Sequence, residues 1–406
     1  MSLATAATFG TVYQTIGLTL FYIVVLGTVL YVLVNVLFAG KAELGSELEL
    51  ASNRKPYYPD EVLEGPKLDR TLTLALIFLF VLAVGIPLYW VMEPARQENA
   101  AEGFNDKFVS RGEALFAATG ENPRALNCAG CHGGLTGGFR DDYVLTDPVT
   151  GDVSVVDWRA PALNTVLLRF SRQEVRFILT YGRPGTPMPP WGVDGGGPLN
   201  DQQVQNLIDY LDANQISAED SQEAAAAEVE RYMDAEFEDG DEVFENEGEA
   251  LFNLGLLEGN FASGAYACAR CHTAGWSYST VESELVDGTI VVDRESYEAA
   301  VANSGCGGSF GPSLCDDSTH RQFPAEEDHV LFVTDGSTEG IGYGRQGQGS
   351  GKMPGFGLMP AEDGLFWING GQPRDPGPGM LTQEQIEAIV EYERELTSLA
   401  AQEAEG

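Results

Sequence analysis

The first hundred residues are dominated by two uncharged, apolar stretches. Residues 1–40 contain no Asp, Glu, Lys or Arg, and residues 12–38 are dense in Val, Leu, Ile, Tyr and Phe. Residues 71–92 form a second uncharged run. Each stretch reaches the roughly 20 residues that a helix needs to cross a bilayer. The pattern therefore predicts a transmembrane helical hairpin over residues 1–95.

The loop between the stretches, residues 40–70, predicts the orientation of this hairpin. The amino-terminal tail has no basic residue, whereas the loop carries several: Lys41, Arg54, Lys55, Lys67 and Arg70. Because basic loops stay on the cytoplasmic side, we expect the loop in the cytoplasm and both hairpin ends outside. The first stretch lacks the basic start and cleavage site of a signal peptide, so we expect it to be retained. Neither stretch contains His or a charged residue, which favours a simple anchor.

The rest of the chain repeats itself. Residues 112–116, Gly-Glu-Ala-Leu-Phe, recur as 248–252, and each copy is followed by Cys-x-x-Cys-His, Tyr-Gly-Arg and Met-Pro. Each copy then ends in an amphipathic helical pattern with identical spacing: Leu199, Gln203, Leu207 and Tyr210, matched by Leu381, Gln385, Ile389 and Tyr392. The repeat predicts two domains, residues 104–215 and 243–400. The acidic, Ala-rich segment 216–242 between them predicts a solvated helical linker.

The two Cys-x-x-Cys-His motifs are the most specific chemical feature of the chain. Each supplies two thiols and an imidazole: Cys128, Cys131 and His132, then Cys268, Cys271 and His272. In the attachment motif of a c-type haem, the thiols bond to the porphyrin vinyl groups and the imidazole ligates the iron. A thioredoxin-like dithiol has no use for the His, and a zinc site would need ligands pooled from both motifs. We therefore predict two covalently bound haem c groups.

A Met-Pro loop in each domain offers a second axial ligand. Met188 lies in Gly-Thr-Pro-Met-Pro-Pro-Trp, and Met353 lies in Gly-Lys-Met-Pro-Gly-Phe. Loops rich in Pro and Gly hold a thioether without helix or strand support, although Met also fills gaps in apolar cores. We predict Met188 and Met353 as iron ligands; Met359 and Met380 remain alternatives in the second domain. The spare histidines, His320 and His329, are expected at the surface.

Both domains resemble class I cytochrome c, a small all-α fold around one haem. In that family a Gly and an aromatic residue of the first helix pack on an aromatic residue of the last, and both domains have matching residues: Gly112, Phe116 and Tyr210, and Gly248, Phe252 and Tyr392. The family also has a Pro whose carbonyl accepts a hydrogen bond from the ligand His; Pro161 and Pro312 resemble it. The resemblance implies an all-α protein, a membrane hairpin followed by two class I domains in tandem. Long insertions between His and Pro, especially residues 273–311, distinguish this chain from compact members.

Net charge and the two remaining cysteines restrict the partners and the compartment. The formal net charge of −38 excludes nucleic acid as a partner and would attract a basic redox protein. A hydrated surface suited to high salt would explain the same charge without a partner. Cys306 and Cys315 flank a Gly-rich stretch. Because haem c is attached on the oxidising side of the membrane, we expect a disulfide between them.

These features together favour an electron carrier, since an iron with His and Met ligands has no open position for a substrate. The anchored dihaem arrangement resembles the cytochrome c subunits of quinol–cytochrome c reductase complexes, the actinobacterial dihaem subunit in particular, and those of cbb-type oxidases. The resemblance implies a multi-pass protein of the cytoplasmic membrane, with its haem domains outside. It would relay electrons between a cytochrome b/Rieske reductase and a haem–copper oxidase or soluble acceptor. A dihaem peroxidase or sulfur-compound dehydrogenase would instead need an open iron and acid–base groups.

Overall fold

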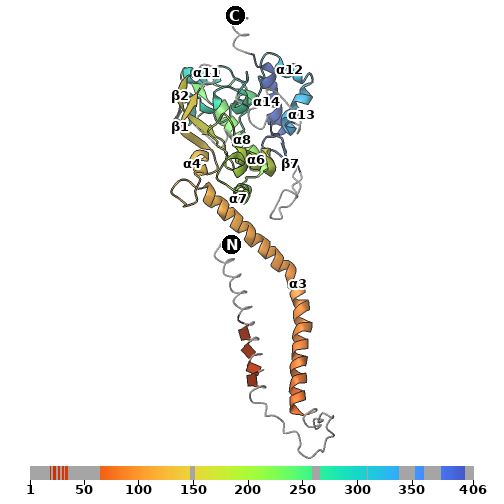
Figure 1. The fold of residues 1–406 in the computed structure, drawn as a ribbon. Helices are drawn as coiled ribbons and strands as arrows, with labels where there is room; N and C mark the ends of the chain where they lie inside the picture. The colour runs from red at the N-terminus through yellow and green to blue at the C-terminus, as the bar shows by residue number, and fades with distance from the viewer. Residues whose placement is uncertain are drawn as a thin grey trace, which may run out of the picture. The chain divides into compact units, whose positions relative to one another are not determined.

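The structure, a computed structural model, divides into two compact units, Met1–Phe104 and Asn105–Gly406. The residues that it describes are these, together with scattered positions between 19 and 34: 65–146, 151–257, 266–308, 310–337, 353–360 and 376–397. Figure 1 colours the chain from its amino-terminal to its carboxyl-terminal end.

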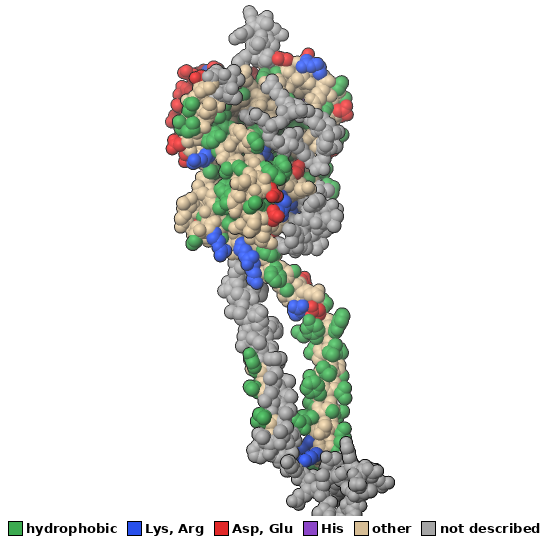
Figure 2. All heavy atoms as spheres, in the orientation of Figure 1, with side chains coloured by type: hydrophobic (Ala, Val, Ile, Leu, Met, Phe, Trp, Pro, Cys, Tyr) green, Lys and Arg blue, Asp and Glu red, His purple; other side chains and the backbone are tan. Residues whose placement is uncertain are grey.

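The first unit is built around α3 (Pro66–Phe116), whose last turns belong to the second unit. Its apolar side chains are exposed along the predicted second span (Figure 2). Among the described residues, α3 is the one helix long and apolar enough to cross a membrane. The predicted first span, 12–38, and the loop 40–70 lie mostly outside the described residues. The described positions between 19 and 34 are helical.

The second unit contains both predicted domains. After the end of α3, the first domain consists of the following elements: α4 (Cys128–His132), β1 (Gly138–Thr146), β2 (Val153–Ala160), α5 (Val166–Arg169), α6 (Arg172–Tyr181), η1 (Val193–Gly195) and α7 (Asp201–Ala213). The second domain and the segment before it follow: α8 (Ala218–Met233), β3 (Glu236–Phe237), α9 (Glu247–Phe252), α10 (Ala269–His272), η3 (Trp276–Tyr278), β4 (Ser283–Val286), β5 (Thr289–Val292), α11 (Arg294–Val301), α12 (Ser318–Gln322), α13 (Glu326–Asp335), β6 (Leu358–Met359), β7 (Gly377–Pro378) and α14 (Gln383–Glu395).

The strands show that the second unit is not purely α-helical, which corrects the all-α prediction. β1 and β2 form an antiparallel hairpin with Gly138 opposite Ala160, and β3, β5 and β4 form a second sheet in that order. The hairpin lies in the insertion between His132 and Pro161. Its second strand is rich in Val, which favours a pleated conformation. Most strands of these two sheets, which the all-α prediction did not include, thus come from the insertions between His and Pro.

The first and last helices cross in the same way in both domains. A Cβ on Gly112 would overlap the carbonyl oxygen of Asn206 and approach the Cβ of Tyr210 to 2.6 Å. A Cβ on Gly248 would similarly overlap the backbone of α14 and approach the Cβ of Tyr392 to 2.9 Å. Only Gly permits helix axes to approach this closely. Next to each Gly, an aromatic pair has ring centroids 5.3 Å apart in both domains: Phe116 with Tyr210, and Phe252 with Tyr392.

Gln203 and Gln385, which occupy equivalent positions in the last helices of the two domains, both take part in the N-terminal caps of those helices. Asn200 caps α7 and its side chain accepts a hydrogen bond from the Gln203 backbone amide, while the Asn200 backbone amide donates to the Gln203 side chain. Thr382 and Gln385 form the same reciprocal pair at α14. Such capping boxes satisfy two backbone donors that a helix start otherwise leaves unpaired.

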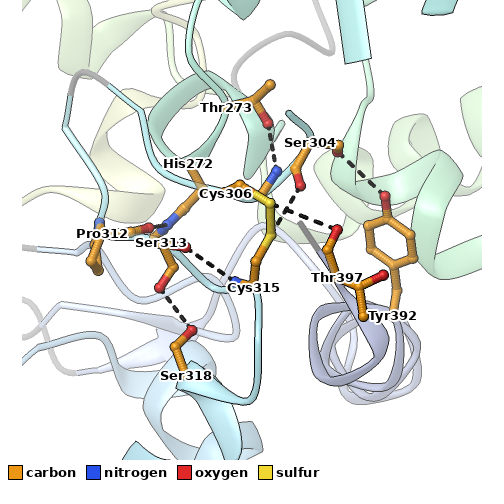
Figure 3. Close-up of a disulfide and its surroundings, with 11 residues drawn as sticks. His272, Thr273, Ser304, Cys306, Pro312, Ser313, Cys315, Ser318, Tyr392 and Thr397 are labelled. Atoms are coloured by element: carbon orange, nitrogen blue, oxygen red, sulfur yellow. Dashed lines mark hydrogen bonds between the residues drawn. A yellow bond between two sulfur atoms is a disulfide. The ribbon is translucent and has the colours of Figure 1, made fainter. Parts of the chain in front are cut away.

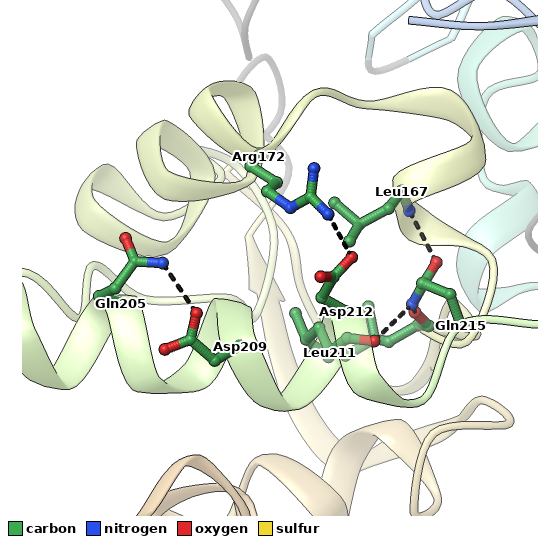
Figure 4. A network of polar contacts seen from close by, with 8 residues as sticks. Leu167, Arg172, Gln205, Asp209, Leu211, Asp212 and Gln215 are labelled. Atoms are coloured by element: carbon green, nitrogen blue, oxygen red, sulfur yellow. Dashed lines mark hydrogen bonds and ion pairs between the residues drawn. The ribbon is translucent and has the colours of Figure 1, made fainter. Parts of the chain in front are cut away.

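Polar contacts hold α7 against α5 and α6 in the first domain (Figure 4). The Arg172 guanidinium donates to the Asp212 carboxylate at 2.7 Å. Gln215 accepts from the Leu167 amide at 2.8 Å, and Gln205 donates to Asp209 at 3.0 Å. Burial raises the pKa of the Asp209 carboxyl, against the hydrogen bond from Gln205. This carboxylate is therefore more costly to ionise than an exposed one.

The segment between the domains is helical as predicted, but it is packed rather than solvated. Ala225, Val229 and Tyr232 of α8 are buried in the core of the second domain. The Tyr232 hydroxyl accepts hydrogen bonds from the backbone amides of Gly255 and Leu257 at 2.9 and 3.0 Å. The apolar residues on one face of α8 thus make it part of the second domain, despite its acidic composition.

Candidate functional site

One large cavity of the second unit contains side chains of both Cys-x-x-Cys-His motifs. Its empty volume, with the open solvent at its mouth included, is about 2510 Å³. All the predicted haem-binding residues line it: Cys128, Cys131, His132, Met188, Cys268, Cys271, His272 and Met353. The structure therefore brings the predicted ligands of both domains to a single cavity.

Each of the two motif histidines is oriented by a hydrogen bond between its Nδ1 and the carbonyl oxygen of a proline. His132 Nδ1 lies 2.9 Å from the carbonyl oxygen of Pro161, and His272 Nδ1 lies 2.9 Å from that of Pro312. With the proton on Nδ1, each ring donates to the carbonyl and keeps Nε2 free for a metal. The predicted roles of these two prolines fit this geometry.

The loop after each His is also repeated. Gly137 donates its amide to the His132 carbonyl, and Gly307 donates to that of His272, both at 2.9 Å. Both glycines have positive φ, 94° and 106°, a conformation that other residues adopt only with strain. The backbone is therefore bent in the same way behind both imidazoles.

The Met188 loop is held to the end of α6 by backbone hydrogen bonds. Arg183 donates its amide to the Met188 carbonyl at 3.1 Å, and Trp191 donates to the Leu179 carbonyl at 3.0 Å. Gly182 ends the helix with φ 70°, and a Cβ there would lie 2.8 Å from the Met188 carbonyl oxygen. These contacts fix the loop without regular secondary structure.

The Met353 loop has the same contacts with the end of α13. Ser337 donates to the Met353 carbonyl and Phe356 donates to the Val333 carbonyl, both at 3.0 Å. Gly336, with φ 78°, approaches the Met353 carbonyl as Gly182 approaches that of Met188. Gly336 is therefore the structural counterpart of Gly182. The sequence had matched Tyr181–Arg183 with residues 343–345, which lie outside the described residues.

The alternative methionines of the second domain lie elsewhere. Met380 is fully buried in the apolar core. Met359 lines a separate small cavity together with Leu167 and Pro378. Of the three methionines, only Met353 lines the cavity that contains His272, which favours Met353 as the ligand.

The thiols of the motifs have environments unlike those of a redox dithiol. Burial raises the pKa of Cys128 to about 12 and raises that of Cys268 well above its usual value. Reactive dithiols have a lowered pKa, so these thiols are poor redox nucleophiles. Among the described residues, no group of three His, Cys, Asp or Glu side chains converges on a metal site. The geometry thus favours neither the dithiol nor the zinc interpretation.

Cys306 and Cys315 form a disulfide, as predicted, with Cα atoms 5.0 Å apart. The bond closes the loop that holds His272, because this loop contains both Gly307 and Pro312 (Figure 3). It therefore fixes the two backbone segments that position the second imidazole.

Sequence reasoning missed a group of arginines, of which Arg159 and Arg169 are buried. Arg159, Arg169, Arg183 and Arg270, here called the arginine cluster, all line the cavity. Burial lowers the pKa of Arg159 and Arg169 to about 10 each and that of Arg270 to about 9. No local pattern distinguishes these four arginines from the other basic residues of a chain of net charge −38, so the sequence carried no signal for them.

A buried contact between a histidine and a carboxylate was also missed. His329 was predicted at the surface, yet its side chain is 3% exposed and its Nε2 lies 3.1 Å from Glu393 Oε2. Its ring stacks on Phe323 with centroids 4.9 Å apart. His329 faces inward because the apolar residues of α13 share its face, so the prediction was wrong. His320 is exposed, as predicted.

The residues present fit a haem. They provide paired thiols, an imidazole with Nε2 available, a thioether on a fixed loop, apolar walls and cationic side chains for the haem carboxylates. Comparison with protein families gives one match: residues 108–211 match the model described as cytochrome c oxidase, cbb3-type, subunit III. No curated protein and no solved structure matches the chain.

The match and the cavity together define the class of protein. The chain contains a cytochrome c domain, which implies covalently bound haem c and electron transfer by a c-type cytochrome. The apolar helix α3 is long enough to anchor it in a membrane.

Proposed function

We propose that the protein is a membrane-anchored dihaem cytochrome c that relays electrons within a respiratory chain. One haem would bind at Cys128, Cys131 and His132, and the other at Cys268, Cys271 and His272. The observation that carries this proposal is that both motifs, each with its own Met-Pro loop, line one cavity. Haem groups in one cavity are close enough to exchange electrons directly.

The proposed axial ligands favour a carrier over an enzyme. Met188 and Met353 would complete the two iron coordination spheres, leaving no open position for a peroxide or sulfur substrate. The chain's own residues would position these ligands: the prolines hold the imidazole rings, and the paired glycines hold the Met loops. The haem supplies the one-electron chemistry when it is bound.

We propose a reductase-linked relay as the physiological role. Electrons would pass from a cytochrome b/Rieske reductase through both haems to a haem–copper oxidase or a soluble acceptor. The alternative is a dihaem subunit of a cbb-type oxidase, which the family match over residues 108–211 favours. Purification in mild detergent distinguishes the two, because the copurifying subunits would belong either to the reductase or to the oxidase.

Haem content and ligand saturation test the proposal directly. The full chain is produced in a host that attaches haem c, and the haem is quantified as its pyridine complex. We expect two haems per chain and no carbon monoxide binding to the reduced protein. One haem per chain, or rapid carbon monoxide binding, would contradict the dihaem carrier.

The proposed topology places residues 41–70 in the cytoplasm and all residues after 93 outside. It rests on the basic loop and on haem attachment outside the cytoplasm. Protease added to intact cells should digest the haem domains and spare an epitope inserted near Asn53. Digestion of that epitope would exclude this topology.

Surface charge suggests a basic docking partner. Figure 2 shows acidic side chains gathered along one edge of the second unit, and the segment 236–247 exposes many of them. If docking is electrostatic, electron transfer to a basic acceptor should slow steeply between low and moderate salt, because the Debye length falls to about 8 Å at 0.15 M. A constant rate would favour fixed subunit contacts and a purely solvating role for the charge.

A further inference from the structure

The hairpin of β1 and β2 exposes an apolar face (Figure 1). Its register places Val144 opposite Val155 and Thr146 opposite Val153, so these four side chains share one face. Val144, Val153 and Val155, here called the valine patch, are 58, 66 and 64% exposed. Single exposed apolar residues are common on protein surfaces, whereas adjacent ones mark an interaction site.

The opposite face of the hairpin is packed inside the second unit. The rings of Tyr143 and Trp158 meet edge-on with centroids 5.7 Å apart. Trp158 is buried and lies 5.2 Å from the ring of Tyr278 in the second domain. Trp158 and Arg140, opposite each other in the register, both line the predicted haem cavity. The valine patch thus lies on the outer side of a hairpin whose base forms part of the cavity wall.

Exposed carboxylates border the valine patch. Asp157 follows Val155 by two residues and so lies on the same face of β2, while Asp152 lies next to Val153 at the other end of the strand. The Asp157 side chain accepts a hydrogen bond from the Asp142 backbone amide at 3.0 Å, which joins the strands where the register shifts. An apolar centre with a polar rim is the arrangement of a protein–protein interface.

The acidic segment 236–247 lacks an apolar centre of this kind. Its carboxylates are exposed, but its apolar residues Phe237, Val243 and Phe244 are buried. Charge attracts a partner from a distance, whereas apolar contact and shape hold it in one position. The hairpin provides both in one place.

We propose that the valine patch and the carboxylates around it are the docking surface for a small basic redox protein, which exchanges one electron with the first haem. Charge complementarity selects this occupant: a partner with an apolar centre ringed by Lys or Arg fits, whereas a second copy of this acidic chain would be repelled. The inference rests on the proposed dihaem function. The surface lies on the insertion that distinguishes this domain from compact cytochromes c.

Stopped-flow electron transfer tests the docking surface. The probe is mitochondrial cytochrome c, a small basic haem protein, mixed with the detergent-solubilised full-length holoprotein. Either protein is reduced and the other oxidised, so that the favourable direction is observed. Each event converts one iron(II) to iron(III) in the donor and one iron(III) to iron(II) in the acceptor.

Removal of the apolar centre should slow this reaction. The triple variant Val144→Thr, Val153→Thr, Val155→Thr keeps β-branched side chains of similar shape. Its second-order rate constant should be about tenfold lower, because apolar contact area is lost. Leu331→Gln, which removes an apolar side chain of α13 that is 57% exposed, is the control and should leave the rate constant unchanged.

Removal of the acidic rim should weaken the salt dependence. Asp142→Asn, Asp152→Asn and Asp157→Asn together should lower the rate constant at low salt about fivefold. A matched triple variant of the segment 236–247 makes the same change in net charge at exposed positions and should have a much smaller effect: Glu238→Gln, Glu242→Gln and Glu247→Gln.

Carbodiimide cross-linking locates the contact, because it joins probe lysines to carboxylates that touch them. We expect cross-links at Asp142, Asp152 or Asp157. Cross-links confined to residues 236–247, or a valine variant that reacts as fast as Leu331→Gln, would exclude the hairpin. Dimerisation that the valine variant abolishes would assign the face to a second copy and also overturn the proposal. Haem content of each sample tests the dihaem function separately.

Discussion

The two cytochrome-like domains share the parts that surround the predicted iron ligands and differ in how the chain closes around them. Both have the Gly–aromatic helix crossing, the Nδ1-to-Pro contact and the same hydrogen bonds at the Met loop. The first domain places its insertion after Gly138, as the β1–β2 hairpin. The second places its insertion before Gly307 and closes the following loop with a disulfide. The shared parts are thus those around the predicted iron ligands, whereas the insertions differ between the two domains.

The cores of the domains also differ. The first domain has a small core of its own, which the polar contacts of α6 and α7 border. The second domain has a larger core that includes α8 and residues after it. The segment between the domains therefore stabilises the second domain and does not act as a free tether.

Replacement of the Met ligands should give the largest effect. Met188→Leu and Met353→Leu should each lower one potential by on the order of 0.1 V, within the range of about 0.8 V that axial ligands span. Each should also remove the far-red absorption band of one Met–iron(III) bond. Potentiometry with optical detection measures both changes.

Met359→Leu and Met380→Leu are the matched controls in the second domain. Both should leave the two potentials unchanged, because neither side chain lines the haem cavity. If either control lowers a potential while Met353→Leu does not, the second ligand is misassigned and the loops are not equivalent.

Loss of the disulfide should affect the second domain alone. The double variant Cys306→Ser, Cys315→Ser should lower the free energy of unfolding by about 3 kcal/mol, because the unfolded chain regains the freedom of a short loop. Native-state hydrogen exchange should show lost protection around α10 and unchanged protection around α4. Equal loss at both helices would mean that the loops of the two domains are coupled.

The Gly–aromatic crossings should be equally sensitive in both domains. Gly112→Ala and Gly248→Ala should each destabilise by about 1–3 kcal/mol, because the new Cβ overlaps the backbone of the last helix. Gly103→Ala lies in the same helix as Gly112 with nothing within 4 Å, so it should stabilise by up to about 1 kcal/mol. Urea unfolding of the three variants measures this. If Gly248→Ala left the free energy of unfolding unchanged, the helices of the second domain would cross at a greater distance than those of the first.

The smallest effect concerns Asp209, whose counterpart in the second domain, Glu391, is exposed. Burial raises the pKa of Asp209 in the folded state, so ionisation destabilises the fold above that pKa and the penalty disappears at lower pH. Asp209→Asn should therefore increase the free energy of unfolding at pH 7 and have little effect near pH 4. Urea unfolding at pH 7 and near pH 4 tests this prediction. Glu391→Gln is the control and should leave the free energy of unfolding unchanged at both pH values.

Much of the cofactor site was predictable because its chemistry requires short, local patterns. Cys-x-x-Cys-His must be contiguous to place two thiols and an imidazole on one helical turn. The sequence motif alone therefore located α4 and α10. The Gly and aromatic positions of the helix crossing repeat at fixed spacing, and so do the Gln residues of the caps. The repeat of Tyr-Gly-Arg did not identify Gly336 as the counterpart of Gly182. The turn before each Met loop depends on a Gly with positive φ and not on the residues next to it.

Only the tertiary structure showed the features that depend on contacts between residues far apart in the sequence. His329 and Glu393 are far apart in sequence, and only the packing of α13 on α14 makes them a buried pair. The arginine cluster collects side chains from both domains around one cavity, which no local pattern encodes. Sequence alone predicted the covalent attachment points, because they depend on neighbouring residues. The sign of the charge around the cofactors was decided by the fold, because burial selects a few cations from a chain that is strongly acidic overall.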